Sequence, residues 1–138
     1  MVKLEREATE SQIFEVIRDW VELLSQDKYE EAFEMFRYHS TEYWSAELIR
    51  TVIKNYGFIE PREDGVTFKV TSLKENLTGQ PFNEVQWWDD DPNRPAEYIG
   101  EIAFTLPLNN EWSDVTALFR IVEVDNVIVL ELDDIHVL

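Results

Sequence analysis

The sequence predicts an α+β domain in which three N-terminal helices pack on one face of a curved, mostly antiparallel sheet. Apolar residues recur at three- and four-residue steps as far as residue 57, which is the period of a helix. Beyond Pro61 they alternate with polar residues, which is the period of a half-buried strand. Because the helices come first and the strands last, with no repeat or linker between them, we expect residues 1–138 to form a single domain.

The helical part divides into three segments. The first helix is expected over about residues 10–26, where an apolar stripe follows a capping box that starts at Thr9. A second, shorter helix is expected after Asp27, which is a favoured N-cap residue. The third follows a polar break at residues 39–41 and ends at Gly57, where a left-handed residue commonly closes a helix.

The second half of the chain reads as strands and loops. Alternation and β-branched residues favour strands, and clusters of Asn, Asp and Pro separate them. The strands expected on this basis are 66–70, 84–88, 98–106, 112–124 and 127–138.

The last two strands allow a sharper prediction, because the dipeptide Asp125-Asn126 suits a two-residue hairpin turn. A turn there places Phe119 opposite Leu132, and we assign this pair to the face covered by the helices. Arg120 and Glu131 then lie opposite each other on the other face, where their opposite charges suit contact with solvent.

The same register sends Asp134 and His136 to the inner face, opposite Ala117 and Val115. A carboxylate and an imidazole two residues apart on one strand can serve as general base and general acid on one substrate. Asp114 is a candidate for a supporting catalytic role if its strand bends toward the same cavity mouth. The alternative interpretation is an ordinary pair of polar residues near a strand end, hydrogen-bonded or in contact with water.

The packing pattern resembles one known superfamily. The segment Trp20-Val21-Glu22-Leu23-Leu24, the segment Asp27-Lys28-Tyr29-Glu30-Glu31-Ala32-Phe33 and the long terminal hairpin are similar to the nuclear transport factor two-like, or cystatin-like cone, superfamily. The resemblance implies a bent sheet that wraps around the helices and leaves a pocket at the open end. Members of the superfamily include isomerases, dehydratases, cyclases, ligand binders and toxin-immunity proteins, so the resemblance does not select a function.

Two groups of residues are binding candidates. Aromatic side chains are able to line a cavity for a flat apolar ligand or, alternatively, to fill the core; they are Trp20, Trp44, Tyr56 and Phe119. The loop segment Trp88, Asp89, Asp90 and Asp91, with the prolines that follow it, is a candidate surface for a protein partner. The alternative for this loop is a simple connection in which one of its two adjacent tryptophans is buried.

Charge and composition exclude several classes. The chain carries 12 Lys and Arg against 29 Asp and Glu, a net charge of −17, which disfavours nucleic acid. The excess acid suits a basic partner or, alternatively, only the solvated faces of the helices. The absence of cysteine suits the cytoplasm, and the absence of a long apolar run argues against a membrane span. Two histidines without close ligand companions predict no metal site, and no cofactor motif is present.

Two hypotheses therefore remain for function. The leading one is a non-catalytic cytoplasmic domain that binds a protein partner or a small apolar ligand, for example as an immunity-type inhibitor of a basic enzyme. The competing one is a cofactor-free isomerase, dehydratase or cyclase that uses Asp134 and His136. In either case we expect a homodimer formed through the outer face of the sheet.

Overall fold

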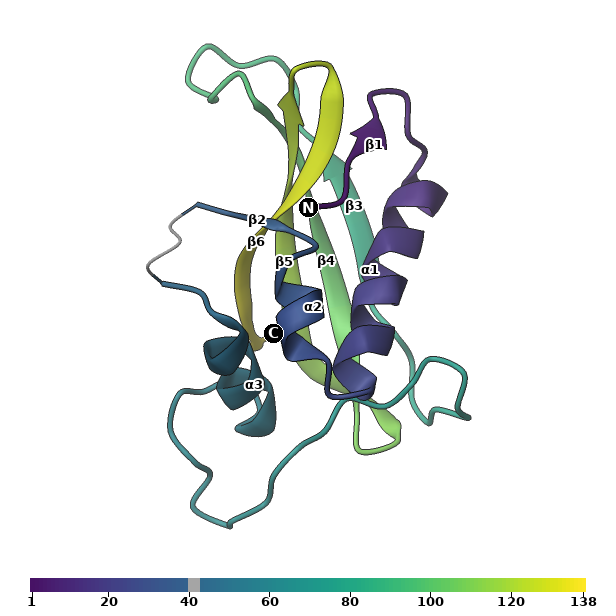
Figure 1. The fold of residues 1–138 in the computed structure, drawn as a ribbon, viewed down its shortest axis with the longest axis vertical. Helices are drawn as coiled ribbons and strands as arrows, with labels where there is room; N and C mark the ends of the chain where they lie inside the picture. The colour runs from purple at the N-terminus through teal and green to yellow at the C-terminus, as the bar shows by residue number, and fades with distance from the viewer. Residues whose placement is uncertain (40–42) are drawn as a thin grey trace.

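The computed structural model describes residues 1–39 and 43–138, so part of the predicted break at residues 39–41 lies outside the described residues. The helices are α1 (Glu10–Ser25), α2 (Tyr29–Phe33) and α3 (Ala46–Lys54). The strands are β1 (Leu4–Glu5), β2 (Arg37–Tyr38), β3 (Asn83–Trp87), β4 (Tyr98–Leu108), β5 (Glu111–Val124) and β6 (Val127–Val137). Figure 1 shows α1 and α2 lying across one face of a curled sheet.

The sheet is built around the three long strands at the end of the chain. Its order is β1-β6-β5-β4-β3, and each neighbouring pair in that order is antiparallel. The short strand β2 pairs in parallel with β6, beside Glu131 and Leu132. The prediction of an α+β fold with a curved, mostly antiparallel sheet is confirmed.

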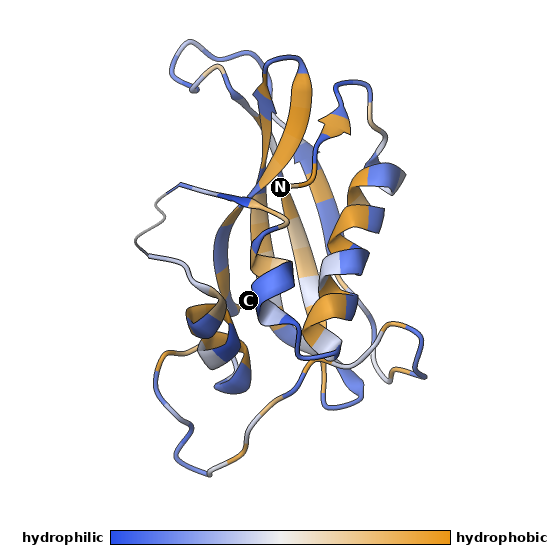
Figure 2. Cartoon of the chain, in the orientation of Figure 1, coloured by the Kyte–Doolittle hydropathy of each residue, from blue (hydrophilic) through white to orange (hydrophobic). Residues whose placement is uncertain are grey.

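Helix α1 lies against the sheet because its apolar residues form one stripe. The helix begins with the predicted capping box, in which Thr9 and Gln12 bond each other's backbone amides. Its buried residues are Ile13, Val16, Ile17, Trp20, Val21 and Leu24. In Figure 2 this hydrophobic stripe faces the strands, and the hydrophilic side of the helix faces outward.

Aromatic rings fill the centre of the space between the helices and the sheet. The ring centroid of Trp20 lies 5.4 Å from that of Phe119 and 5.6 Å from that of Phe36. Phe36 and Phe119 also meet, with centroids 4.9 Å apart. Because Trp20 and Phe119 have 0% and 1% of their surface exposed, these two candidate ligand residues form packed core.

The terminal hairpin turns where the sequence predicts it. Asp125 and Asn126 have φ angles of 50° and 66°, as a type I′ turn requires, and Phe119 pairs with Leu132. Both of these paired side chains are buried in the main core.

A β-bulge then changes the register of the last residues. Asp133 is the extra residue, so Leu118 pairs with Asp134, and Ala117 pairs with Ile135. Ile135 takes the inner position and is buried in the core. The prediction that Asp134 and His136 point toward the helices is therefore wrong, because one added residue reverses the face of all those after it.

Two local predictions are also corrected. Residues 66–70 form no strand, because only Val70 meets the sheet, through an isolated bridge to Leu108, while Val66 is exposed. Asp27 is not the N-cap of α2, since Lys28 holds that position without a side-chain hydrogen bond. Asp27 instead adopts a positive φ of 62° and pairs with Arg50 at 2.8 Å.

In the described part of the chain, no helix has the length and apolar character needed to cross a membrane.

Candidate functional site

Asp134 and His136 bond each other on the outer side of the sheet, near its edge. The bulge at Asp133 carries both side chains to the face opposite the helices. His136 Nδ1 lies 2.7 Å from Asp134 Oδ2, and the two side chains are 38% and 49% exposed. Asp134 Oδ1 also accepts a hydrogen bond from the amide of Ile135. Asp134 and His136 thus form a half-exposed hydrogen-bonded pair at a strand end. Each carboxylate oxygen of Asp134 already has one hydrogen-bond partner.

The pair borders a surface hollow of about 460 Å³ between the end of β6 and the segments that flank α3. We call it the β6-edge hollow. Its apolar lining includes Tyr43, Trp44, Phe58 and Ile59, and its polar lining includes Glu60, Asp134 and His136. Trp44 is fixed in place, because its ring is buried and its indole Nε1–H donates to the carbonyl of Asp133 at 3.4 Å.

Three large apolar side chains of the hollow are exposed to solvent. Tyr43, Phe58 and Ile59 have 58%, 59% and 61% of their surface exposed. We call these three residues the β6-edge patch. Sequence reasoning missed this patch, because Phe58 and Ile59 follow the end of α3 and carry no periodic signal, and only the fold brings them beside Tyr43.

The loop that carries Phe58 and Ile59 is held in place on both sides. At its start, Asn55 donates to the carbonyl of Ile59 at 3.0 Å, and Gly57 lies against β6 with a φ of +94°. At its end, Arg62 forms an ion pair with Asp64 at 2.7 Å. These contacts order the loop that carries Phe58 and Ile59, which lowers the ordering cost of binding.

The pKa of the Asp64 carboxyl group depends on the ion pair at the end of this loop. Its pKa is lowered from 3.8 to about 2, mainly by the hydrogen bonds from Arg62 and then by the amide of Val66. Because the folded pKa is depressed, the stabilisation that Asp64 provides is present above pH 3.8 and is lost as the pH falls toward 2. We expect carboxyl-carbon NMR to give a midpoint near 2 for Asp64, and Arg62→Gln to raise that midpoint toward 3.8.

Arg18→Gln provides the control for this titration, since Arg18 is an exposed arginine of α1. It is expected to leave the Asp64 midpoint unchanged. An Asp64 midpoint that Arg62→Gln does not move would contradict the role given to the ion pair.

The other predicted catalytic and ligand residues are not gathered at this hollow. Asp114 is exposed, and its amide donates to the hydroxyl of Tyr56 at 3.2 Å, away from Asp134. The Tyr56 ring packs on Phe68 with centroids 4.6 Å apart. Of the four aromatic ligand candidates, the hollow contains only Trp44, while Trp20 and Phe119 are core.

The loop proposed for partner binding is ordered by its own arginine. Arg94 pairs with Asp90 at 2.8 Å and donates to the carbonyl of Asp89 at 3.1 Å. Trp88 packs against a small apolar cluster on the outer face, whereas Trp87 is 46% exposed and donates to Glu10 at 3.2 Å. The two tryptophans thus lie on opposite faces, as strand geometry predicts, and Asp89, Asp90 and Asp91 remain exposed.

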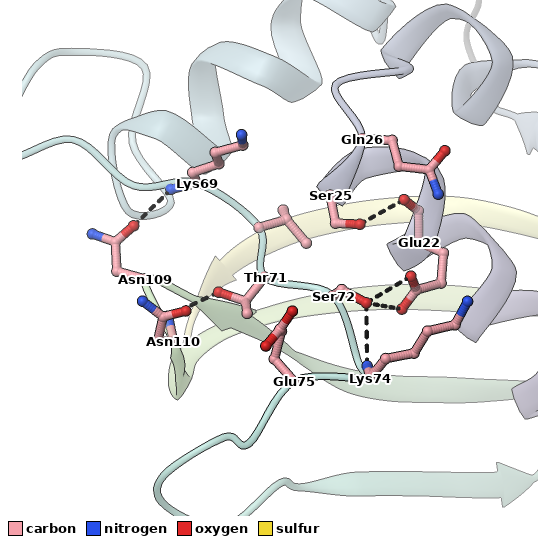
Figure 3. Close-up of a pocket in the computed structure, with 11 residues that line it drawn as sticks. Glu22, Ser25, Gln26, Lys69, Thr71, Ser72, Lys74, Glu75, Asn109 and Asn110 are labelled. Carbon is pink, nitrogen blue, oxygen red and sulfur yellow. Dashed lines mark hydrogen bonds between the residues drawn. The ribbon is translucent and has the colours of Figure 1, made fainter.

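A larger hollow of about 680 Å³ lies below the end of α1 and is mostly polar (Figure 3). Its central carboxylate, Glu22, accepts hydrogen bonds from the hydroxyl of Ser72 at 2.8 Å and from the amide of Leu73 at 2.7 Å. Asn109 similarly accepts from the amide of Lys69 at 2.9 Å. These side chains bond the connecting segment to the helix and the β4–β5 turn, so we interpret this hollow as structural.

Glu131 is a buried carboxylate that sequence reasoning placed in solvent. It lies on the outer face opposite Arg120, but only 1% of its side chain is exposed. Its nearest cations are Arg37 Nε at 3.7 Å and His39 Nδ1 at 4.0 Å, and neither oxygen accepts a hydrogen bond from the described residues. Burial raises the pKa of the neighbouring Tyr98 hydroxyl, and the Glu131 carboxylate adds to that rise.

Among residues 1–39 and 43–138, no group of three or more potential metal ligands comes together. No protein-family model matches the chain, and neither a curated protein nor a solved structure does. The protein is therefore described by its own features: it is an acidic α+β protein with an exposed apolar patch beside carboxylates.

Proposed function

We propose that this chain is a non-catalytic binding domain that docks a basic protein partner through the β6-edge patch. The observation that carries the proposal is the exposure of Tyr43, Phe58 and Ile59 together at one hollow. Exposed apolar side chains rimmed by polar groups are typical of protein interaction sites. The net charge of −17 favours a partner of opposite charge and opposes a second copy of the same chain at this surface.

A ligand or substrate inside the cone has less support. Two of the candidate ligand residues, Trp20 and Phe119, pack on each other and on Phe36 within the core. Asp134 and His136 lie on the opposite face of the sheet and bond each other at an open hollow. An acid–base pair works best when it is shielded from water, so this placement favours binding over catalysis.

The superfamily resemblance and the location remain part of the proposal. The curled sheet with helices across one face supports a cone of the nuclear transport factor two-like type, and the lack of cysteine supports the cytoplasm. The proposed homodimer would use an outer face that carries Glu101, Arg120 and Asp133.

The test is site-specific photo-cross-linking in cells of the source organism, with a photoreactive residue at position 58. We expect a cross-linked protein with a net positive charge. The double variant Phe58→Ser, Ile59→Ser, with the photoreactive residue moved to position 43, should lose it, because the variant removes most of the exposed apolar surface.

The matched control is Val66→Ser, Phe82→Ser, which removes two apolar side chains that are 44% and 47% exposed elsewhere. It should keep the cross-linked partner. Equal capture by both double variants, or a partner that proves to be a second copy of the chain, would overturn the proposal.

A further inference from the structure

The walls of the β6-edge hollow combine the two kinds of group that hold a cationic side chain. Aromatic rings attract a cation through their negative faces, and carboxylates form charge-assisted hydrogen bonds with it. The lining of the hollow includes the rings of Tyr43 and Phe58 and the carboxylates of Glu60 and Asp134. Each oxygen of Asp134 accepts one hydrogen bond within the chain, which leaves a lone pair on each for a further donor.

Within residues 1–39 and 43–138, three arginines show the same combination, because each lies close to both an aromatic ring and a carboxylate. Arg50 lies 4.7 Å from the ring centroid of Tyr29 and pairs with Asp27 at 2.8 Å. Arg62 lies 5.6 Å from the ring centroid of Phe68 and pairs with Asp64. The third case is Arg120, 5.2 Å from the ring centroid of Tyr98 and 3.8 Å from Asp133.

The β6-edge hollow differs from these three places in one respect. Among the described residues, no arginine or lysine of the chain lines it. Its volume of about 460 Å³ leaves room for a side chain from another molecule. An anionic ligand would meet the carboxylates of Glu60 and Asp134, and a purely apolar one would desolvate them without compensation.

We propose that the β6-edge hollow binds an arginine side chain of the partner. Its guanidinium would contact the rings of Tyr43 and Phe58 and the carboxylates of Glu60 and Asp134. This inference rests on the proposed docking function and names the group that the site recognises. Guanidinium is favoured over ammonium because it is planar, stacks on rings and donates to two oxygens at once.

The experiment is an NMR titration of the protein with N-acetyl-arginine amide, followed through amide signals and the indole Nε1–H of Trp44. Saturable shifts are expected at Trp44, at residues 57–60 and at residues 134–136. N-acetyl-citrulline amide, which has nearly the same shape without the charge, should cause no saturable shift there. Saturation by citrulline as well, or shifts spread over the whole acidic surface, would overturn the inference.

Variants separate the contributions of the carboxylate and the ring. Glu60→Gln should weaken arginine binding about threefold to fivefold, as expected for an exposed charge pair. Glu63→Gln is the matched control, because Glu63 has the same charge in the same loop but lies outside the hollow, and it should leave the affinity unchanged. Phe58→Leu keeps an apolar side chain without a ring face and should weaken binding about threefold.

The outcomes distinguish this inference from the proposed function. If arginine does not bind but the patch variant still loses its cross-linked partner, the guanidinium site is wrong and the docking surface stands. If Glu60→Gln and Glu63→Gln weaken binding equally, the arginine responds only to net charge and the guanidinium site is also wrong. If arginine binds as described while the patch variant keeps its partner, the proposed function fails instead.

Discussion

Trp20→Ala is expected to lower the free energy of unfolding by about 4 kcal/mol, as is typical when a large aromatic side chain is removed from a core. The Trp20 side chain is fully buried and its ring packs against the rings of Phe36 and Phe119. Phe36 lies in the connection between α2 and β2, and Phe119 lies in β5, so these rings cannot collapse into the vacated space without moving the sheet. Urea unfolding followed by circular dichroism measures the change.

Two further variants, each a substitution of a tryptophan, check the cause. Trp20→Phe should cost about 1 to 2 kcal/mol, because it removes less volume and the indole Nε1–H has no partner among the described residues. Trp87→Ala should cost less than about 1 kcal/mol, since Trp87 is exposed. A small effect of Trp20→Ala would contradict the packed interior and return the cone centre to consideration as a ligand cavity.

Arg37→Ala is expected to destabilise the protein by about 3 kcal/mol, because it leaves a buried carboxylate without its nearest cation. Glu131 is 1% exposed, and Arg37 Nε at 3.7 Å is its nearest cationic group, so the loss of Arg37 leaves the buried charge poorly compensated. Replacing Glu131 by Met in the Arg37→Ala background should recover most of the loss, since the charge that needed compensation is then absent. Equilibrium unfolding of both single variants and the double variant forms the required cycle.

Arg6→Ala is the matched control for this cycle. Arg6 also pairs with a glutamate, Glu123, at a similar distance of 3.4 Å, but its side chain is 57% exposed. Its loss should cost no more than about 1 kcal/mol. Equal costs for the two arginine variants, or a double variant less stable than Arg37→Ala alone, would show that burial of Glu131 is not the cause.

The elements predicted correctly are those whose cause is local in the chain. The capping box at Thr9 and the stripe of α1 depend on residues within a few positions of one another, and both are confirmed. The hairpin at Asp125 and Asn126 is confirmed for the same reason, because the turn residues set the first pairs of the ladder. Strands β1 and β2 were missed, since two residues are too few to show a period.

The candidate site was predicted only in part. Asp134 and His136 do lie together, because residues two apart on a strand share a face in any register. Their face was predicted wrongly, and the exposed patch beside them was not predicted at all. The alternation of residues 66–70 predicts a strand, but alternation alone does not supply a neighbouring strand to pair with.

Short-range periodicity and backbone preference are enough to predict the fold class, the apolar face of α1 and the place of the last turn. The bulge at Asp133, the burial of Glu131 beside β2, and the shared hollow of Phe58 and Tyr43 depend instead on contacts between distant segments. One unpaired residue leaves the apolar pattern of a strand intact, yet it reverses the face of every later side chain. Burial, likewise, is set by whichever distant segment packs above a residue.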